Sequence, residues 1–275
     1  MNPIIKNWWK VLVIVLTALV ARILLLQLLP LRSSSTFELP PSALSQAIGM
    51  IPTAAIVVTL AYAVIALILL IVQEGLGGNR LSRVIRCSVP FGLLWFMGVL
   101  ESVPALGKPL LPEFLIGVTD IIPVLLIGVL ISLGISKGEH PSQGNLLPRV
   151  GLDILVIAFT YLVGRYLAYA VIHINSGYST RPEATFWWTL AMGLAVGVAY
   201  SFWRDSVQGR TPLAKGLWFG IVAFGLYWAL NNFFMPLLFD ISFIQFDPPI
   251  MNYVFRVAVD VLFVILGVWI VEKTI

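Results

Sequence analysis

Cysteine, histidine and charge are scarce in this 275-residue sequence. It contains one cysteine, Cys87, and two histidines, and only 11% of its residues are charged. A single cysteine excludes an internal disulfide and a cysteine metal cluster, and two distant histidines do not readily make a zinc site with the few acids. No His-Glu-x-x-His motif and no pair of intramembrane aspartates beside glycine is present. We therefore expect no metal and no cofactor, and the sequence favours a protein that is not an enzyme.

Long apolar runs are what the sequence has in abundance. Hydrophobic residues make up 59% of the chain and its mean hydropathy is +0.97, which indicates an integral membrane protein. A bilayer crossing takes about 20 apolar residues. The chain is thus predicted to be an all-α, polytopic transmembrane helix bundle of about eight spans, at residues 8–29, 47–72, 89–106, 115–135, 150–174, 185–203, 217–239 and 252–271. The third is the shortest, and a re-entrant segment is the alternative because Pro104 and Pro112 follow closely.

Basic residues predict how the bundle lies in the membrane. They are spread over short loops rather than gathered in a patch, so we expect no nucleic-acid partner despite the net charge of +4. Cytoplasmic loops are enriched in Lys and Arg. With the N terminus inside, the cytoplasmic side holds eleven of them: Lys6, Lys10, Arg80, Arg83, Arg86, Lys137, Arg149, Arg204, Arg210, Lys215 and Lys273. The outer side holds only Arg32, Lys108 and Arg181. We therefore expect both termini in the cytoplasm and the protein in the plasma (inner) membrane, among membrane lipids.

The loops are too short for a soluble domain, so residues 1–275 are predicted to form a single membrane domain. Within it there is a weak internal echo: residues 91–95 read FGLLW and residues 224–228 read FGLYW. This echo suggests a parallel repeat of four plus four spans, about 1–140 and 141–275, as in some transporters. Chance is the alternative explanation, because aromatic residues and glycine are abundant here.

A polar stripe runs along the fifth predicted span. Tyr161, Arg165, Tyr169 and His173 are spaced four apart, so they fall along one face of a helix. A charge at bilayer depth costs several kcal/mol unless it is paired or hydrated, and such residues often mark functional sites. The stripe therefore predicts a helix that lines a polar cavity.

Other buried charges are predicted at the same depth, towards the outer side. Three arginines and three acids share this layer, and two asparagines of the seventh span join it: Arg22, Arg165, Arg256, Glu101, Asp120, Asp260, Asn231 and Asn232. The opposite charges can nearly neutralise one another. One interpretation is a vestibule in which arginines hold an anionic group, since the guanidinium matches carboxylate and phosphate geometry. The alternative is a network of ion pairs that fixes the helix register.

These residues support three functional hypotheses. The leading one is a binding or transport protein with an outward-facing polar cavity for an anionic or amphipathic small molecule or a lipid head group. The second is a structural or accessory subunit that docks a partner membrane subunit. The third is a membrane enzyme in which Glu101 or Asp120 acts as general acid or base.

The fifth span also carries part of a protease-like pattern. Thr160, Tyr161 and Arg165 stand where a Glu-Glu-x-x-x-Arg sequence would, and only the arginine matches. In this arginine, and in the number and size of the last four spans, the chain faintly resembles the CAAX-type intramembrane proteases. The Glu-Glu pair and the histidine motifs of that family are missing. The resemblance therefore implies a degenerate membrane scaffold without catalytic residues.

Four further expectations concern the helices. Gly193 and Gly197 form a small-xxx-small face suited to close helix contact. Because their span, the sixth, carries no charge, we expect it at the edge of the bundle or against a partner.

The basic segment 80–86 is predicted to be a loop, or a short amphipathic helix on the inner leaflet. Transporters often interrupt their helices at the binding site, and the candidate interruptions are Pro104, Pro123 and Pro236.

Overall fold

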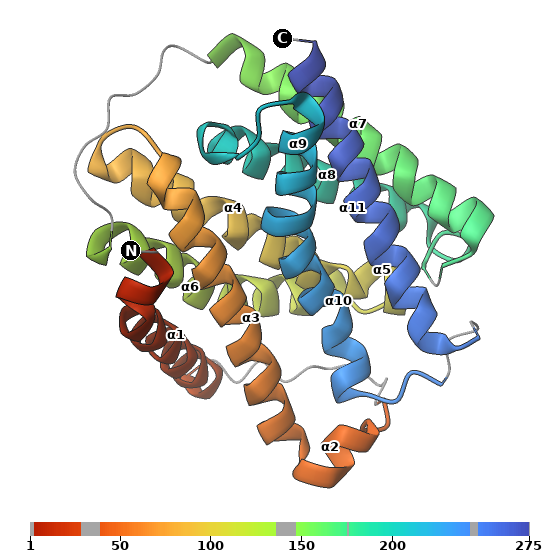
Figure 1. Cartoon of the computed structure of the whole chain (residues 1–275). Helices are drawn as coiled ribbons and strands as arrows, with labels where there is room; N and C mark the ends of the chain where they lie inside the picture. Colours follow the sequence, from red (N-terminus) through yellow and green to blue (C-terminus); the bar gives the residue numbers. More distant parts are fainter. Residues whose placement is uncertain (1–2, 29–38, 136–146, 175, 243–246, 275) are drawn as a thin grey trace.

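The computed structural model describes residues 3–28, 39–135, 147–174, 176–242 and 247–274, and these residues are almost entirely helical (Figure 1). Among them no β-strand occurs, although an isolated bridge joins Pro41 to Phe239. The segments 29–38 and 136–146, with the predicted loop residues Arg32 and Lys137, lie outside the described residues.

Eight helical segments of the described chain are long and apolar enough to cross a membrane, which confirms the predicted polytopic all-α bundle. The helices are α1 (Pro3–Leu28), α2 (Ala43–Ile48), α3 (Met50–Val72), α4 (Arg80–Leu100), α5 (Ser102–Leu106), α6 (Leu110–Gly134), α7 (Leu147–Leu167), α8 (Pro182–Trp203), α9 (Pro212–Leu217), α10 (Leu226–Leu238) and α11 (Pro249–Lys273). Short segments connect or extend them: the 3-10 turns η1 (Gln73–Gly75) and η3 (Arg204–Ser206), and the π-helical η2 (Ala168–Ile172) and η4 (Trp218–Gly225). The third span joins α4 to α5, and the seventh joins α9, η4 and α10.

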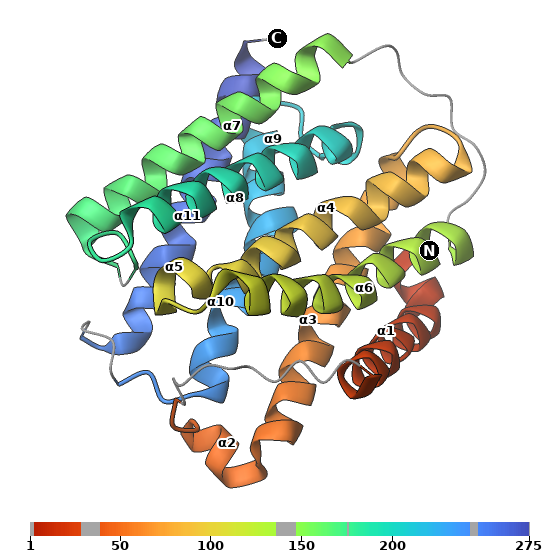
Figure 2. The same ribbon diagram turned by 180° about the vertical axis from the view of Figure 1, so that it is seen from behind.

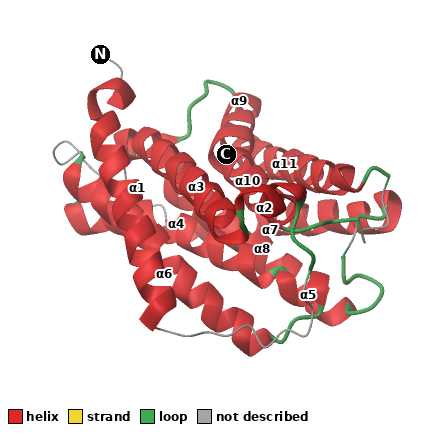
Figure 3. Cartoon of the chain, turned by 90° about the horizontal axis from the view of Figure 1, so that it is seen from below, coloured by secondary structure: helices red, strands yellow, loops and turns green. Residues whose placement is uncertain are grey.

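The spans form two crossed layers. In one layer α7, α8, α4 and α6 lie side by side, and α11, α9–α10 and α3 cross them in the other (Figures 1 and 2). The layers are joined at both edges, because α11 packs against α7 and α1 packs against both α6 and α3. Figure 3 shows α1 along the edge of the bundle, beside α3 and α6. Of the eight candidate spans, α1 has the smallest buried share.

Aromatic side chains fill the space between the layers, and the two echoing motifs meet there. The ring of Phe91 stands edge-on to that of Tyr227, with 5.5 Å between centroids, and Trp95 lies 6.1 Å from the same tyrosine. These rings are almost completely buried. The contact joins α4 to α10 across the core, while the four-plus-four repeat stays a prediction.

The third span differs from the prediction. Asn79 caps α4, because its side chain accepts a hydrogen bond of 2.9 Å from the amide of Ser82. The helix therefore begins at Arg80, and the basic segment 80–86 forms its first turns rather than a loop or a separate surface helix. The whole span covers Arg80–Leu106, 27 residues, so it is neither the shortest span nor a re-entrant one.

Pro104 interrupts this span beside Glu101. Proline lacks the N–H that would bond to the carbonyl four residues earlier, here that of Leu100, and its ring crowds that carbonyl. Helix α4 accordingly ends at Leu100 and α5 begins at Ser102. Glu101 stands between them with φ −59° and ψ −26°, which are helical values, so the interruption is a one-residue kink.

The prediction that Pro123 and Pro236 interrupt their helices is wrong. Pro123 lies inside α6 and Pro236 lies inside α10, and both helices continue past them. The seventh span is instead modified at η4, which ends at Gly225, eleven residues before Pro236. Wider π-helical turns of this kind are rare and often occur near functional sites.

The sixth span is not at the edge of the bundle. Helix α8 packs between α7 and α4, and its inward-facing residues such as Met192 and Val196 are fully buried. The predicted close contact is confirmed: a Cβ added to Gly193 would lie 2.9 Å from the carbonyl oxygen of Ala158, and one on Gly197 would lie 2.8 Å from the α7 backbone. An uncharged helix can contact lipid or be buried among other helices, so the lack of charge did not place α8. Its small residues favour burial, because they permit close helix contact.

Close packing of α4 on α6 leads to a prediction at Gly128. A Cβ added there would lie 2.5 Å from the Cα of Ser88, so we expect Gly128→Ala to lower the free energy of unfolding by about 1–3 kcal/mol. Gly134→Ala, in the same helix, is the matched control, since no atom of the described chain lies within 4 Å of its added Cβ. Unfolding in mixed detergent micelles measures both, and equal stability of the two variants would contradict the tight α4–α6 contact.

Candidate functional site

Glu101, at the kink, joins three helices through ion pairs. Its Oε1 accepts from Nη1 of Arg165 at 3.2 Å and from Nη1 of Arg256 at 3.1 Å. Arg165 also forms an ion pair with Asp260, with 2.6 Å between Nε and Oδ1. The kinked third span, α7 and α11 are thereby connected. The opposite charges of the predicted layer therefore do neutralise one another, and Arg165 finds its counter-charges on other spans.

Arg165 is enclosed rather than open to a cavity. Its side chain is 1% exposed, and its Nε donates to the Tyr161 hydroxyl at 3.2 Å. The guanidinium lies 5.0 Å from the ring centre of Trp188 and 5.9 Å from that of Trp228, an arrangement that favours a cation. The Trp228 indole donates to Asp260 at 2.6 Å. This part of the stripe forms a packed, ion-paired connection between helices.

The stripe is not continued regularly beyond Arg165. Helix α7 ends at Leu167, and Tyr169 lies in the π-helical η2, which ends at Ile172. His173 caps it with a left-handed φ of 57°. Because a π-helix has wider turns, a spacing of four no longer keeps side chains on one face. Tyr169 turns to α8, where its hydroxyl lies 3.3 Å from that of Thr189.

A separate ion pair joins α1 to α6. Arg22 Nη2 donates to Asp120 Oδ2 at 2.8 Å. The Tyr62 hydroxyl lies beside Arg22, and the Trp95 indole N–H lies beside Asp120, but neither makes a well-formed hydrogen bond with the described residues. Several buried polar atoms thus surround this pair without saturating it.

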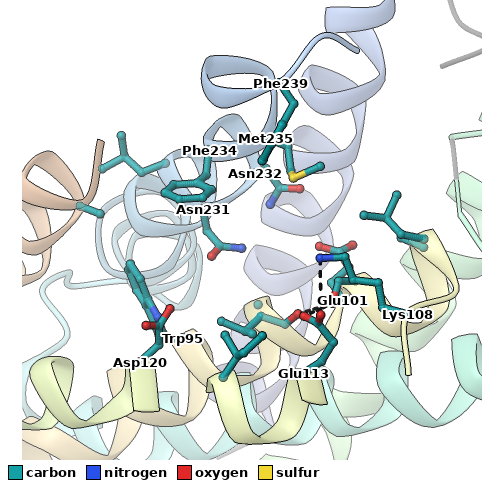
Figure 4. A pocket seen from close by; sticks show the side chains of 18 of the residues that line it. Trp95, Glu101, Lys108, Glu113, Asp120, Asn231, Asn232, Phe234, Met235 and Phe239 are labelled. Atoms are coloured by element: carbon teal, nitrogen blue, oxygen red, sulfur yellow. Dashed lines mark hydrogen bonds and ion pairs between the residues drawn. The ribbon is translucent and has the colours of Figure 1, made fainter. Parts of the chain in front are cut away.

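Both groups of ion pairs border one cavity of about 300 Å³ between the two helix layers. Its polar and charged lining residues are Arg22, Trp95, Glu101, Ser102, Lys108, Glu113, Asp120, Asn231, Asn232, Tyr253 and Arg256. Apolar residues complete the wall, chiefly Leu230, Phe234 and Met235 from α10 and Phe239, which caps that helix. Figure 4 shows Asp120 and Trp95 on one side, Lys108, Glu101 and Glu113 on the other, and the Asn231 amide between them.

The predicted site residues divide into two groups. Six of them contribute to the cavity wall: Arg22, Glu101, Asp120, Asn231, Asn232 and Arg256. Among the described residues, Tyr161, Arg165, Tyr169 and Asp260 stand behind that wall. Tyr169 borders a second void of about 10 Å³, which Glu101 and Arg256 also border. A space of this size suits a single water molecule. The ion pair of Glu101 and Arg256 therefore separates the cavity from the packed interior.

Sequence reasoning missed a third ion pair at the cavity. Glu113 is 4% exposed; its Oε1 pairs with Lys108 at 3.4 Å, and its Oε2 accepts from Ser102 at 2.8 Å. The predicted fourth span began at residue 115, so Glu113 fell outside it, and Lys108 counted only as a loop charge. An acid in the first turn of a helix, close to a lysine, was the available signal.

The position of the Asn231 amide depends on Gly98, which has no side chain. A Cβ added to Gly98 would lie 2.7 Å from both Nδ2 and Oδ1 of Asn231. The amide therefore rests directly on the α4 backbone and faces the cavity, as Figure 4 shows. A larger residue at position 98 would displace it.

A second ionic network lies at the opposite end of the bundle. Arg204 pairs with Asp153 at 2.9 Å and with Glu272 at 3.0 Å, and Glu272 also accepts from Lys215 and Tyr200, each at 2.5 Å. Asp153 precedes Arg165 by twelve residues along α7, about 18 Å at 1.5 Å per residue, so it is out of reach of that arginine and pairs with Arg204. The network as a whole was not expected, because Arg204 and Lys215 counted as loop charges.

The described residues contain no group of three His, Cys, Asp or Glu side chains placed to hold a metal ion. Comparison with known protein families, with characterised proteins and with solved structures found no match for this chain, and so lends no support to the resemblance to CAAX-type proteases.

Proposed function

We propose that the protein is an integral membrane protein that binds or transports an anionic or amphipathic small molecule or a lipid head group. The cavity between the helix layers is the observation that carries this proposal. Charged side chains at bilayer depth cost free energy, and they tend to mark ligand pathways. Here three ion pairs of the described chain, from four spans and the turn before α6, border one space. Its volume, about 300 Å³, is within the range of small-molecule sites.

The cavity wall suits an amphipathic ligand. The charged residues are supplied by α1, the third span, the turn before α6, α6 itself and α11, whereas Leu230, Phe234 and Met235 line the α10 side. A head group can therefore meet the ion pairs while an adjoining aliphatic segment meets α10. A mostly apolar wall with a few fixed polar groups is typical of ligand sites in proteins.

The side of the membrane follows from the basic residues. If the loops rich in Lys and Arg are cytoplasmic, the cavity end, which carries Lys108, faces outward. We therefore propose an outward-facing site in the plasma (inner) membrane, with membrane lipids as neighbours and the lipid pool as one source of the ligand.

Filling the cavity tests the proposal. Asn231→Trp is expected to lower the phospholipid retained per mole of protein in mild detergent by about tenfold or more, because the indole would occupy the ligand's space. Leu226→Trp is the matched control, since Leu226 lies in the same helix but is exposed. Lipid content is measured by mass spectrometry, and thermal unfolding verifies that both variants fold. Retention of the same phospholipid by folded Asn231→Trp would contradict the proposal.

A structural or accessory membrane subunit is the second candidate. The observation in its favour is that the basic residues of the wall, Arg22, Lys108 and Arg256, each have an acidic partner within the chain. Purification of a stoichiometric partner subunit, together with an absence of retained ligand, would favour this candidate over the binding protein.

A further inference from the structure

We infer that the cavity selects a ligand without net charge that carries both an anionic and a cationic group: a zwitterion such as an ammonium-bearing phosphate ester. This inference rests on the proposed function and names the chemical class of its ligand. The proposed ligand is thus a zwitterion rather than the simple anion that the arginines in the sequence suggest.

The charge of the wall is the first argument. The described wall residues include three cations, Arg22, Lys108 and Arg256, and three anions, Glu101, Glu113 and Asp120. Behind them Arg165 and Asp260 form one more opposite pair, so the balance is unchanged. A low-dielectric site that is already neutral resists any occupant that adds net charge, because no counter-charge is left to compensate it. A ligand with equal and opposite charges avoids that penalty.

The hydrogen-bonding atoms near Arg22 are the second argument. Arg22 uses Nη2 for Asp120, while its Nε and Nη1 are buried and make no well-formed hydrogen bond with the described chain. Nε and Nη1 lie on different edges of the guanidinium, and each can donate a single charge-assisted hydrogen bond to an oxygen of a phosphate or carboxylate. The anionic half of the ligand is therefore assigned to this end of the cavity.

Acceptors for a cationic group lie in the same space. The amide nitrogen of Asn232 donates to the Trp228 carbonyl at 3.0 Å, whereas its Oδ1 has no hydrogen-bond partner among the described residues. Asp120 Oδ1 is likewise buried without such a partner in the described chain. Asn232 is 3% exposed and Asp120 5%, and both border the cavity. An ammonium group has only donors to offer, so it complements these oxygens.

The size of the cavity limits what enters it. A volume of about 300 Å³ corresponds to roughly ten water molecules at about 30 Å³ each. This space holds a head group and a short aliphatic segment. A lipid would therefore leave most of its chain outside, whereas a small free zwitterion would fit entirely.

Four probes distinguish charge and source: lysophosphatidylethanolamine (zwitterionic, one chain), lysophosphatidylglycerol (anionic, one chain), monoacylglycerol (uncharged, one chain) and glycerophosphoethanolamine (zwitterionic, no chain). Affinities are measured on the full-length protein in maltoside micelles by native mass spectrometry and calorimetry. We expect the zwitterionic lysolipid to bind about tenfold tighter than the anionic one. Equal binding of the chainless zwitterion would identify a soluble ligand, and weaker binding a lipid; both outcomes support the inference.

Variants that change the wall charge provide the decisive comparison. Asp120→Asn leaves the wall with one excess positive charge, and we expect the preference to shift towards the anionic lysolipid by about tenfold. Glu113→Gln makes the same change of charge at the other side of the cavity, should Asp120→Asn fail to fold. Asp205→Asn is the control, since its ion pair with Arg86 lies away from the cavity wall.

The outcomes separate the inference from the proposed function. Tighter binding of the anionic or uncharged probe by the unmodified protein, lost in Asn231→Trp, would overturn the zwitterion and leave the binding site intact. A preference unchanged in folded Asp120→Asn and Glu113→Gln would also overturn it. Failure of all four probes to bind would overturn both the zwitterion and the binding function.

Discussion

Replacing Arg165 with leucine is expected to destabilise the protein by about 3–5 kcal/mol. The guanidinium is 1% exposed and is the ion-pair partner of Asp260, whose side chain is fully buried. Without it Asp260 retains the hydrogen bond from Trp228 but loses its counter-charge. Glu101 would still pair with Arg256. An unpaired buried carboxylate is the main cause of the expected loss, which unfolding in mixed micelles measures.

A second substitution separates charge from packing. If the loss of stability comes from the unpaired carboxylate of Asp260, adding Asp260→Asn to Arg165→Leu should recover part of the stability. Each of the two changes nevertheless removes a polar contact. Asp205→Asn, which breaks a partly exposed pair, should cost no more than about 1 kcal/mol and serves as the control. A loss in Arg165→Leu as small as that of the control would show that the buried pair contributes little.

Ligand binding by the double variant decides what Arg165 does. Among the described residues the cavity wall includes Arg256 and Glu101 but not Arg165. We therefore expect folded Arg165→Leu combined with Asp260→Asn, which leaves the charge balance around the cavity unchanged, to keep the probe preference of the unmodified protein. A lost preference in folded protein would instead make Arg165 part of the binding site, as its position in the stripe first suggested.

The spans and the depth of the charges could be predicted from the sequence because both are local properties. An apolar run long enough to cross a bilayer is visible in the sequence itself, and counting residues along each run gave a common level for Arg22, Glu101 and Asp120. The partners could not be predicted in the same way. Which carboxylate meets Arg22 depends on which helices are neighbours, and that is decided by packing across the whole bundle.

The rotation of each helix was the other unpredictable quantity. The spacing of Tyr161, Arg165 and Tyr169 predicted that they face a cavity. In the structure they face the packed interior, because α7 approaches α8 closely at Gly193 and because η2 is π-helical. Residues at span ends were missed for a different reason. Glu113 and Lys108 were treated as loop residues, although helix ends can also lie against a buried site.

Glu272 is expected to have the second largest effect on stability. Its carboxylate accepts from Arg204, Lys215 and Tyr200, and its side chain is 7% exposed. Hydrogen bonds to a charged group contribute about 1.5–3 kcal/mol. Glu272→Leu removes these bonds, but Arg204 keeps Asp153, so we expect a loss of about 2–3 kcal/mol, below that of Arg165→Leu. Glu272→Gln, which keeps an acceptor oxygen, should fall between.

An exposed acid near the same end of the bundle provides the control. Glu74→Leu should change the free energy of unfolding by no more than about 0.5 kcal/mol, because Glu74 is exposed. Equal losses in Glu272→Leu and Glu74→Leu would contradict a stabilising network.

Binding measurements on Glu272→Leu also test how the two ends of the bundle are related. Glu272 lies twelve residues from Asp260 along α11, about 18 Å at 1.5 Å per residue. Asp153 and Arg165 have the same spacing along α7, so ion pairs hold α7 and α11 together at both ends, through Arg204 at one and directly at the other. The cavity, by contrast, is bordered by α1, α3, the third span, α6 and α10, by α11 only at Tyr253 and Arg256, and by no described residue of α7. If α7 and α11 act only as a rigid support, folded Glu272→Leu should keep the zwitterion preference; a changed preference would mean that the distant ion pairs control the shape of the cavity.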